Sequence, residues 1–116
     1  DLCEMWSESL AKRTDRRSKQ ALDFWKSAFP FCAFSDGDML GVISSDAGME
    51  PVVYLMHDSP ADAFIVAPDF DDFLRRWEQL RYCDQSGLCF FSNGGKSQLD
   101  PSSKLAEQLR AWLPTN

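Results

Sequence analysis

The chain has 116 residues, of which 44% are hydrophobic and 13% aromatic, and it carries a formal net charge of −6 at pH 7. A chain of this size and apolar content can bury one packed core, so disorder is excluded and residues 1–116 are treated as a single domain. No apolar run approaches the roughly 18 residues that a membrane span requires, so we expect a soluble, cytoplasmic protein with no membrane partner. The chain starts at Asp1 rather than Met, which is compatible with a shortened N-terminus.

The cysteine and histidine content argues against metal and nucleophile chemistry. Cys3, Cys32, Cys83 and Cys89 follow no metal-binding spacing, and His57 is the only histidine. A zinc site, a Ser-His-Asp triad and a Cys-His pair therefore have no support, and we predict no metal, cofactor or catalytic residue. Reduced, partly buried thiols are favoured over a disulfide between Cys83 and Cys89, which stays open as the alternative.

The N-terminal third of the chain predicts helices followed by strands. Apolar residues at helical spacing indicate one helix over residues 2–13 and a second helix, or a continuation of the first, over residues 16–29. Pro30 ends this helical pattern, because proline lacks the N–H that a helix interior needs. Residues 31–34 then alternate loosely, as in a strand.

A turn, a strand and a loop lead from there to the centre of the chain. Residues 35–38 contain an Asp-Gly pair, which is typical of a hairpin turn, and residues 39–43 form the next predicted strand. A polar loop follows at residues 44–50.

The centre of the chain, residues 50–81, predicts a hairpin followed by a capped helix. Strands are expected at residues 52–56 and 63–66, with turn chemistry between them at residues 59–62. A helix starts near Asp69, because carboxylates there face the positive end of the helix dipole. Its apolar side chains form one stripe that we expect to pack on the hairpin as core: Phe70, Phe73, Leu74, Trp77 and Leu80.

The C-terminal part predicts a turn at residues 84–87, a short edge strand at residues 88–91 and a flexible loop at residues 92–96. The last helix is expected to be capped by Asp100, with Pro101 at its first position. Gly-Gly-Lys-Ser in the loop suggests a phosphate-binding loop only superficially, because the earlier glycine of that motif is replaced by phenylalanine.

Together, the elements predict an α+β fold with a mainly antiparallel sheet of about four to five strands and helices packed on one side.

Charge is unevenly distributed along the chain. Residues 27–74 contain nine acidic and no basic residues, whereas residues 1–26 carry a net charge of +1 and residues 75–116 a net charge of +2. Most of these acids lie in turns between predicted strands, so at least some of them should gather at one edge of the sheet. This face would repel phosphates, so we expect no nucleic acid partner.

The acidic loops have two interpretations. Solvated acids keep a small protein in solution and need no partner. Alternatively, a negative surface recruits a cationic protein and steers its approach. The residues that we predict to contact such a partner are six loop acids: Asp36, Asp38, Asp46, Glu50, Asp58 and Asp62.

Paired carboxylates next to a histidine also raise the question of catalysis. Asp36 and Asp38 flank a glycine, a spacing that is as typical of a turn as of a metal site, and the sequence shows no third ligand beside them. His57 next to Asp58 at a strand end is more often a hydrogen-bonded structural pair than a general base. We therefore predict that the protein is not an enzyme.

Three motifs in the middle of the chain resemble the SUKH superfamily, which includes a fungal cell-wall-assembly regulator and many bacterial toxin-immunity proteins. They are Gly37-Asp38-Met39-Leu40 before a strand, the run from Pro51 to His57-Asp58, and the run from Ile65 to Leu74 with Trp77 after it. Their order and spacing are similar to those of the family, and the resemblance covers about residues 29–82.

The resemblance implies an α+β fold that acts by binding proteins, with no catalytic residues to carry over. The expected function is therefore that of an immunity protein that neutralises a basic toxin domain, such as a nuclease, through the acidic surface. A regulatory or scaffold module that uses an apolar pocket between sheet and helices is the alternative, and a small metal-dependent or small-molecule enzyme is a weaker one. An exposed strand at residues 88–91 would also allow a homodimer by edge pairing.

Overall fold

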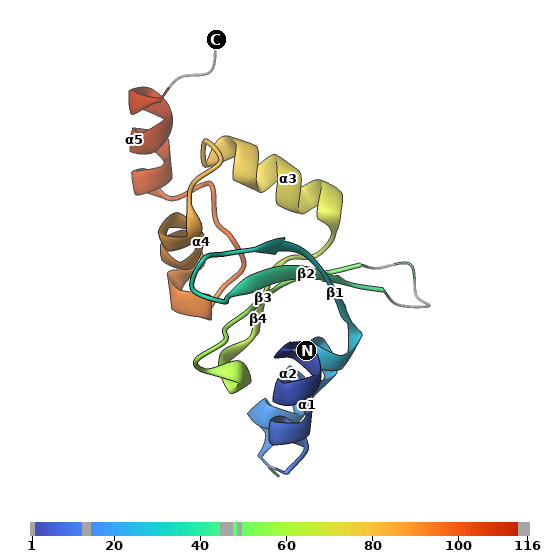
Figure 1. Cartoon of the computed structure of the whole chain (residues 1–116). Helices are drawn as coiled ribbons and strands as arrows, with labels where there is room; N and C mark the ends of the chain where they lie inside the picture. Colours follow the sequence, from blue (N-terminus) through green and yellow to red (C-terminus); the bar gives the residue numbers. More distant parts are fainter. Residues whose placement is uncertain (1, 13–14, 45–47, 49, 114–116) are drawn as a thin grey trace.

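The computed structural model describes residues 2–12, 15–44, 48 and 50–113. At its centre lies an antiparallel sheet of four strands in the order β1-β2-β3-β4 (Figure 1). The strands are β1 (Ala28–Ala33), β2 (Met39–Ile43), β3 (Val52–Leu55) and β4 (Phe64–Ala67). The predicted α+β class, the antiparallel pairing and the number of strands are therefore confirmed.

Five α-helices and two short 3-10 helices complete the described part of the chain. They are α1 (Leu2–Ala11), α2 (Arg16–Ser27), α3 (Phe70–Gln79), α4 (Gln85–Phe91), α5 (Lys104–Trp112), η1 (Pro60–Asp62) and η2 (Asn93–Gly95). Within the residues described, no helix combines the length and the apolar character needed to cross a membrane.

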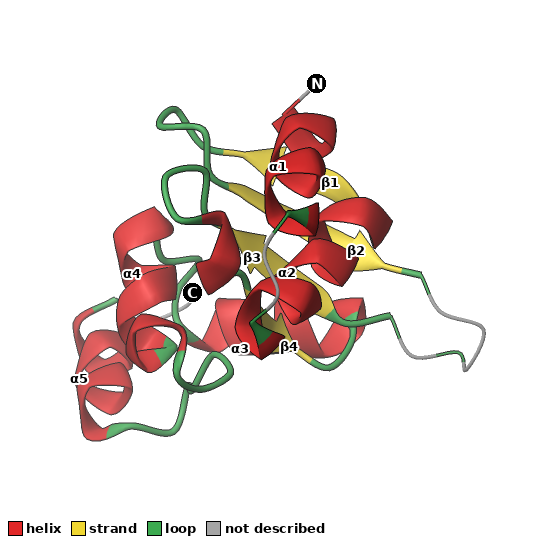
Figure 2. Ribbon diagram, turned by 90° about the horizontal axis from the view of Figure 1, so that it is seen from below, coloured by secondary structure: helices red, strands yellow, loops and turns green. Residues whose placement is uncertain are grey.

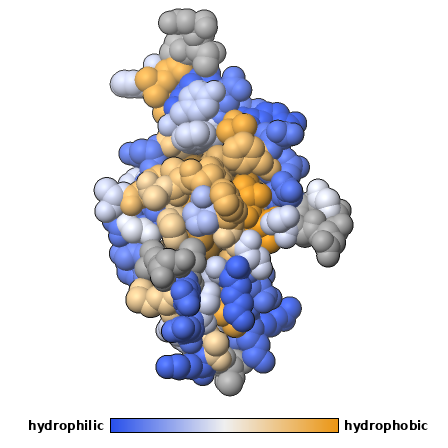
Figure 3. Space-filling view, turned by 45° about the vertical axis from the view of Figure 1, so that its right-hand side comes forward, coloured by the Kyte–Doolittle hydropathy of each residue, from blue (hydrophilic) through white to orange (hydrophobic). Residues whose placement is uncertain are grey.

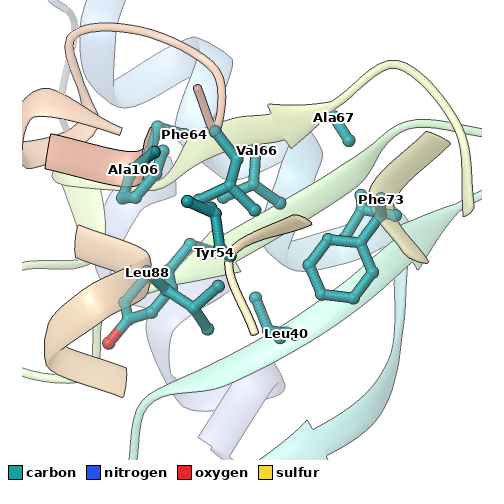
Figure 4. Close-up of a cluster of buried hydrophobic side chains, with 11 residues drawn as sticks. Leu40, Tyr54, Phe64, Val66, Ala67, Phe73, Leu88 and Ala106 are labelled. Atoms are coloured by element: carbon teal, nitrogen blue, oxygen red, sulfur yellow. The ribbon is translucent and has the colours of Figure 1, made fainter. Parts of the chain in front are cut away.

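The sheet is covered on the first of its two faces by the C-terminal helices. Tyr54 of β3 packs there in a buried cluster with Phe73 of α3 and Leu88 of α4 (Figure 4). The Tyr54 ring also stacks on Phe64 of β4, with 5.2 Å between the ring centroids. Because side chains alternate along a strand, the neighbours of Tyr54 in β3 point to the opposite face.

On that opposite face, α1 and α2 cover the sheet. Val53 and Leu55 of β3 form a second buried cluster with Leu10 of α1 and Trp25 of α2, and Figure 2 shows these two helices in front of the strands. The Trp25 indole N–H donates to the carbonyl of Pro60 at 3.0 Å, which joins α2 to η1. The sequence predicts helices on one side of the sheet; in the structure they lie on both, and β3 is buried on both faces.

The segment predicted as an edge strand at residues 88–91 is helical, so that prediction is wrong. Asp84 is the N-cap of α4, and its carboxylate accepts a hydrogen bond from the Gly87 N–H at 2.9 Å. The apparent turn at residues 84–87 is thus the first turn of a helix. Since residues 88–91 offer no strand, the predicted route to a homodimer by edge pairing is absent there.

Two further boundaries differ from the prediction. Helix α2 ends at Ser27, and Pro30 lies inside the edge strand β1, where the pairing with β2 shifts register between Pro30 and Cys32. Edge strands and bulges are the positions where a sheet tolerates proline. The last helix begins after Ser103, whose hydroxyl accepts from the Ala106 N–H, whereas Asp100 accepts two hydrogen bonds from Ser102 in the preceding turn.

The edge of β4 is protected by the loop that precedes α5. The Leu99 N–H donates to the carbonyl of Val66 at 2.8 Å. Gly95 has φ +92° and lies against Phe64, since a Cβ at Gly95 would approach that ring to 2.8 Å. Gly94 has φ +64° but faces open space.

This difference between two adjacent glycines gives a stability prediction. Gly94→Ala adds only the cost of a left-handed backbone, so the free energy of unfolding should fall by about 1 kcal/mol. Gly95→Ala adds the clash with the Phe64 ring, and the loss should reach about 3 kcal/mol. Urea denaturation of both variants measures the difference, and equal losses would show that the loop does not pack on Phe64.

Candidate functional site

The predicted acidic site centres on a carboxylate that three segments bring together. Asp38 precedes β2, Tyr54 lies in β3, and His57 follows β3. Because Met39 pairs with Leu55, Asp38 comes to lie beside the chain that leaves β3. Gln85, the first residue of α4, closes the group from the side of the C-terminal helices.

Asp38 is 7% exposed, and donors surround its carboxylate. One oxygen accepts from the Tyr54 hydroxyl at 2.6 Å and from the Gln85 amide at 3.1 Å. The other oxygen accepts from the backbone N–H of His57 at 2.9 Å and lies 2.7 Å from the His57 Nδ1. The buried charge is therefore fully paired, as a stable fold requires.

Asp36 joins this group through Gln85. The Gln85 amide donates to the Asp36 carboxylate at 2.7 Å and to the Tyr54 hydroxyl at 2.9 Å. The other Asp36 oxygen accepts from the Asp38 N–H at 3.0 Å, which shapes the turn before β2. We call Asp36, Asp38, Tyr54, His57 and Gln85 the Asp38 network.

These contacts shift the pKa values of three members. Burial by itself raises the pKa of Asp38, but hydrogen bonds from Tyr54 and from the backbone and ring of His57 outweigh it and lower the pKa. The hydrogen bond to Asp38 raises the pKa of His57. Burial, followed by the hydrogen bond to Asp38, raises the pKa of Tyr54. The network thus favours an Asp38 carboxylate, a neutral Tyr54 and a protonated His57.

The arrangement supplies the third metal-ligand group that the sequence did not reveal. Asp36, Asp38 and His57 each offer a ligand atom, and these atoms lie within 4.8 Å of one another. However, the His57 Nδ1 is already bonded to Asp38, and the Gln85 amide points its donors at both carboxylates. A cation there would have to displace these donors, so the geometry fits a structural cross-link better than a metal centre.

The six acids predicted to contact a partner are split between the two ends of the sheet. The exposed Asp36 and Asp58, the half-buried Asp62 and the buried Asp38 lie at the end that carries the turn between β1 and β2. Glu50 lies at the opposite end, in the connection from β2 to β3, and Asp46 lies outside the described residues.

Two of the acids at the first end have internal partners. Asp62 pairs with Arg17 of α2, and the Asp38 oxygens are used within the Asp38 network. Asp36 and Asp58 are the exposed acids at this end. The gathering of some acids at one edge is confirmed, while their role in binding stays a prediction.

A mostly apolar groove of about 700 Å³ starts beside the Asp38 network. An apolar pocket between sheet and helices was expected as an alternative binding site, but its position and lining residues were not identified from the sequence. Its walls are β1, α3 and the start of α4, and we call it the β1–α3 groove. It is lined by Phe31, Cys32, Phe34, Ser35, Leu40, Phe70, Phe73, Leu74, Trp77, Tyr82, Cys83, Asp84, Gln85, Ser86 and Leu88. Figure 3 shows hydrophobic side chains gathered over the middle of one face of the molecule.

The groove corrects the prediction that the whole stripe of α3 is core. Phe73 and Leu80 are buried, but Phe70 and Leu74 are 37% and 40% exposed. The stripe is wider than the sheet can cover, because β1 ends the sheet on this side.

The thiols of Cys32, Cys83 and Cys89 are free, as favoured from the sequence, and burial raises the pKa of Cys83 to about 11.

The Gly-Gly-Lys-Ser segment does not form a phosphate cradle. The N–H groups of Gly95 and Ser97 donate to the carbonyl of Ser92, and that of Lys96 donates to Asn93. These donors are therefore unavailable to an anion, in agreement with the rejection of that motif from the sequence.

No protein-family model, no curated protein and no solved structure matches the chain. The resemblance to the SUKH superfamily accordingly stays a prediction.

The buried position of Asp38 predicts a loss of stability on substitution. Asp38→Asn removes the negative charge that pairs with His57. The new side-chain NH2 group would also face hydrogen-bond donors of the network instead of accepting from them. The free energy of unfolding should therefore fall by about 2–3 kcal/mol. Asp58→Asn, at the same end of the sheet but exposed, is the control and should change it by less than about 0.5 kcal/mol. Equal effects in urea denaturation would refute the cross-linking role of Asp38.

The contact between His57 and Asp38 also predicts a pH dependence. Because the pKa of His57 is raised above 6.5 in the folded chain, protonated His57 stabilises the fold fully below that pH. This stabilisation should disappear as the pH rises through the folded pKa. Urea denaturation from about pH 6 to about pH 9 should show the decline in the native chain and not in His57→Gln. Parallel curves for the two proteins would contradict the assignment.

Proposed function

We propose that the protein is a non-enzymatic, cytoplasmic protein-binding domain. The observation that carries this proposal is the exposed β1–α3 groove, which is lined by aromatic side chains and lies beside the acidic end of the sheet. Aromatic residues are enriched at protein interfaces, and contiguous apolar surface on a folded domain marks interaction sites.

Several large apolar side chains at and around the groove are more exposed than packing alone explains. Phe29 of β1 is 77% exposed and Tyr82 is 58% exposed, in addition to Phe31, Phe70 and Leu74. A single exposed apolar side chain is common and needs no explanation. Five exposed apolar side chains on β1, on α3 and in the segment that follows α3 support a role in binding.

The Asp38 network supports a role without catalysis. A general base or a nucleophile needs a group that can exchange a proton with a substrate. In this network the Asp38 carboxylate, the Tyr54 hydroxyl and the Gln85 amide nitrogen are hydrogen-bonded to one another, and Asp38 is buried. The network is therefore better suited to holding the fold than to chemistry.

On the resemblance to the SUKH superfamily, we propose further that the partner is a basic toxin domain and that the protein is its immunity protein. The net charge of −9 over residues 27–74 supports this partner, since opposite charge accelerates association and disfavours wrong partners. Asp36 and Asp58 are the acids best exposed for this purpose at the end near the groove.

A regulatory or scaffold module that binds a cellular protein is the second candidate. The same groove favours it, because an apolar pocket between sheet and helices was the site expected for such a module. The cluster of Asp36, Asp38 and His57 is the feature behind the weaker, metal-dependent alternative. Binding of a toxin would distinguish the immunity function from the regulatory or scaffold module and from the metal-dependent enzyme.

Co-expression with a toxin encoded by a neighbouring gene tests the proposed function. Cells should grow when both proteins are made, and the toxin should be recovered with the tagged protein. Neutralisation that fails, with no complex recovered, would overturn the immunity function.

Two matched double variants test which acids contribute. Asp36→Asn with Asp58→Asn should weaken toxin binding about tenfold, chiefly through slower association. Asp100→Asn with Glu107→Gln removes the same charge from exposed positions before and within α5, outside the groove, and should change the affinity by less than about twofold. Unchanged affinity in both variants would rule out electrostatic docking at these acids.

A further inference from the structure

We infer that the β1–α3 groove binds a basic amphipathic segment of the partner protein, with an apolar side chain held between β1 and α3 and Lys or Arg side chains at both ends. This inference rests on the protein-binding function proposed above, and it adds the chemistry of the segment that is bound.

The interior of the groove is suited to an aromatic or aliphatic anchor. Phe31 contacts Phe70 edge to face at 5.2 Å between ring centroids, and Phe73 stacks on Trp77 at 5.6 Å. Trp77 in turn meets Tyr82 edge to face at 5.1 Å. Aromatic rings therefore follow α3 along the whole groove, and an inserted side chain would contact ring faces and edges on several sides.

The ends of the groove are acidic. At one end lies Asp84, the only charged side chain among the described residues that line the groove, and Asp36 is bonded to the lining residue Gln85. At the other end Phe70 is shared with a second hollow that Glu50, Asp69 and Asp71 line. The cation in that second hollow, Arg75, lies 3.1 Å from Asp72 in a salt bridge, so it is already compensated.

The distance between these ends limits the segment. Helix α3 has 10 residues and spans about 15 Å between the two acidic ends. Basic side chains that reach both ends therefore need a spacing of about 10 residues in a helix or about five residues in an extended chain.

Pairing of the segment with β1 is not favoured, although β1 is an edge strand. Pro30 has no N–H to donate, and the register shift next to it disturbs the edge. A second copy of the chain is also a poor occupant, because it carries the same net charge of −6 toward an acidic rim. A basic segment that uses side-chain contacts fits both observations.

Selection of peptides against the full chain tests the inference. The probe is a displayed library of random peptides of about 12–16 residues, and the selected peptides are then measured by fluorescence anisotropy. We expect sequences with an aromatic or aliphatic anchor flanked by Lys or Arg. Selected peptides that lack basic residues would overturn the inferred chemistry.

Matched leucine variants locate the bound peptide. Leu74→Glu in the groove should weaken binding at least tenfold, whereas Leu105→Glu, at the exposed apolar surface of α5, should leave it within about twofold. Because both leucines are exposed, both variants should fold, and thermal melts verify this. Loss of binding in Leu105→Glu alone would overturn the groove as the site and leave the protein-binding function in place.

Charge variants and self-association complete the test. Asp84→Asn keeps the cap of α4 and should weaken binding two- to fivefold, whereas Asp100→Asn should have no effect.

A dimer of the free chain that Leu74→Glu dissociates would overturn the inference in favour of a second copy. A library without binders would overturn it too, whereas failure of the proposed function would appear separately, as failed toxin neutralisation.

Discussion

The carboxylate of Asp38 connects parts of the chain that are far apart in sequence. It binds Tyr54 of β3, His57 beyond β3 and Gln85 of α4, and it is buried. Because a buried charge must keep its partners, this contact ties the start of α4 to the sheet, and Leu88 of α4 packs in the same buried cluster as Tyr54. The segment from Tyr82 to Gln85 then becomes one wall of the β1–α3 groove. The same carboxylate that holds the fold thus shapes the proposed binding surface.

Burial of β3 on both faces explains why apolar side chains remain exposed elsewhere. The helices pack over the centre of the sheet, so the edge strand β1 and the outer part of α3 stay partly uncovered. Leu74 and Phe31 keep large exposed surfaces for this reason. Acidic residues lie at both ends of the same region, with Asp84 at one end and Glu50, Asp69 and Asp71 at the other.

Local chemistry made much of the fold predictable, whereas the site depends on pairing across the chain. The N-cap at Asp69 was predicted correctly, because an aspartate directly before an amphipathic helical pattern is a strong signal for a helix start. The helix at residues 88–91 was missed, since a short apolar run fits either structure and Gly87 resembled a turn. The contact between Asp38 and His57, 19 residues apart, follows from the register of β2 with β3. The composition of a segment does not specify that register.

The most direct test of the central claim is backbone hydrogen exchange of the free chain and of its complex with the toxin. The claim is that β1 and α3 form the surface through which this domain binds a protein. Exchange should slow in residues 28–33 and 70–79 on binding and stay unchanged in residues 104–112. Slowing confined to α5 or to the loop before it, with β1 and α3 unaffected, would contradict the account.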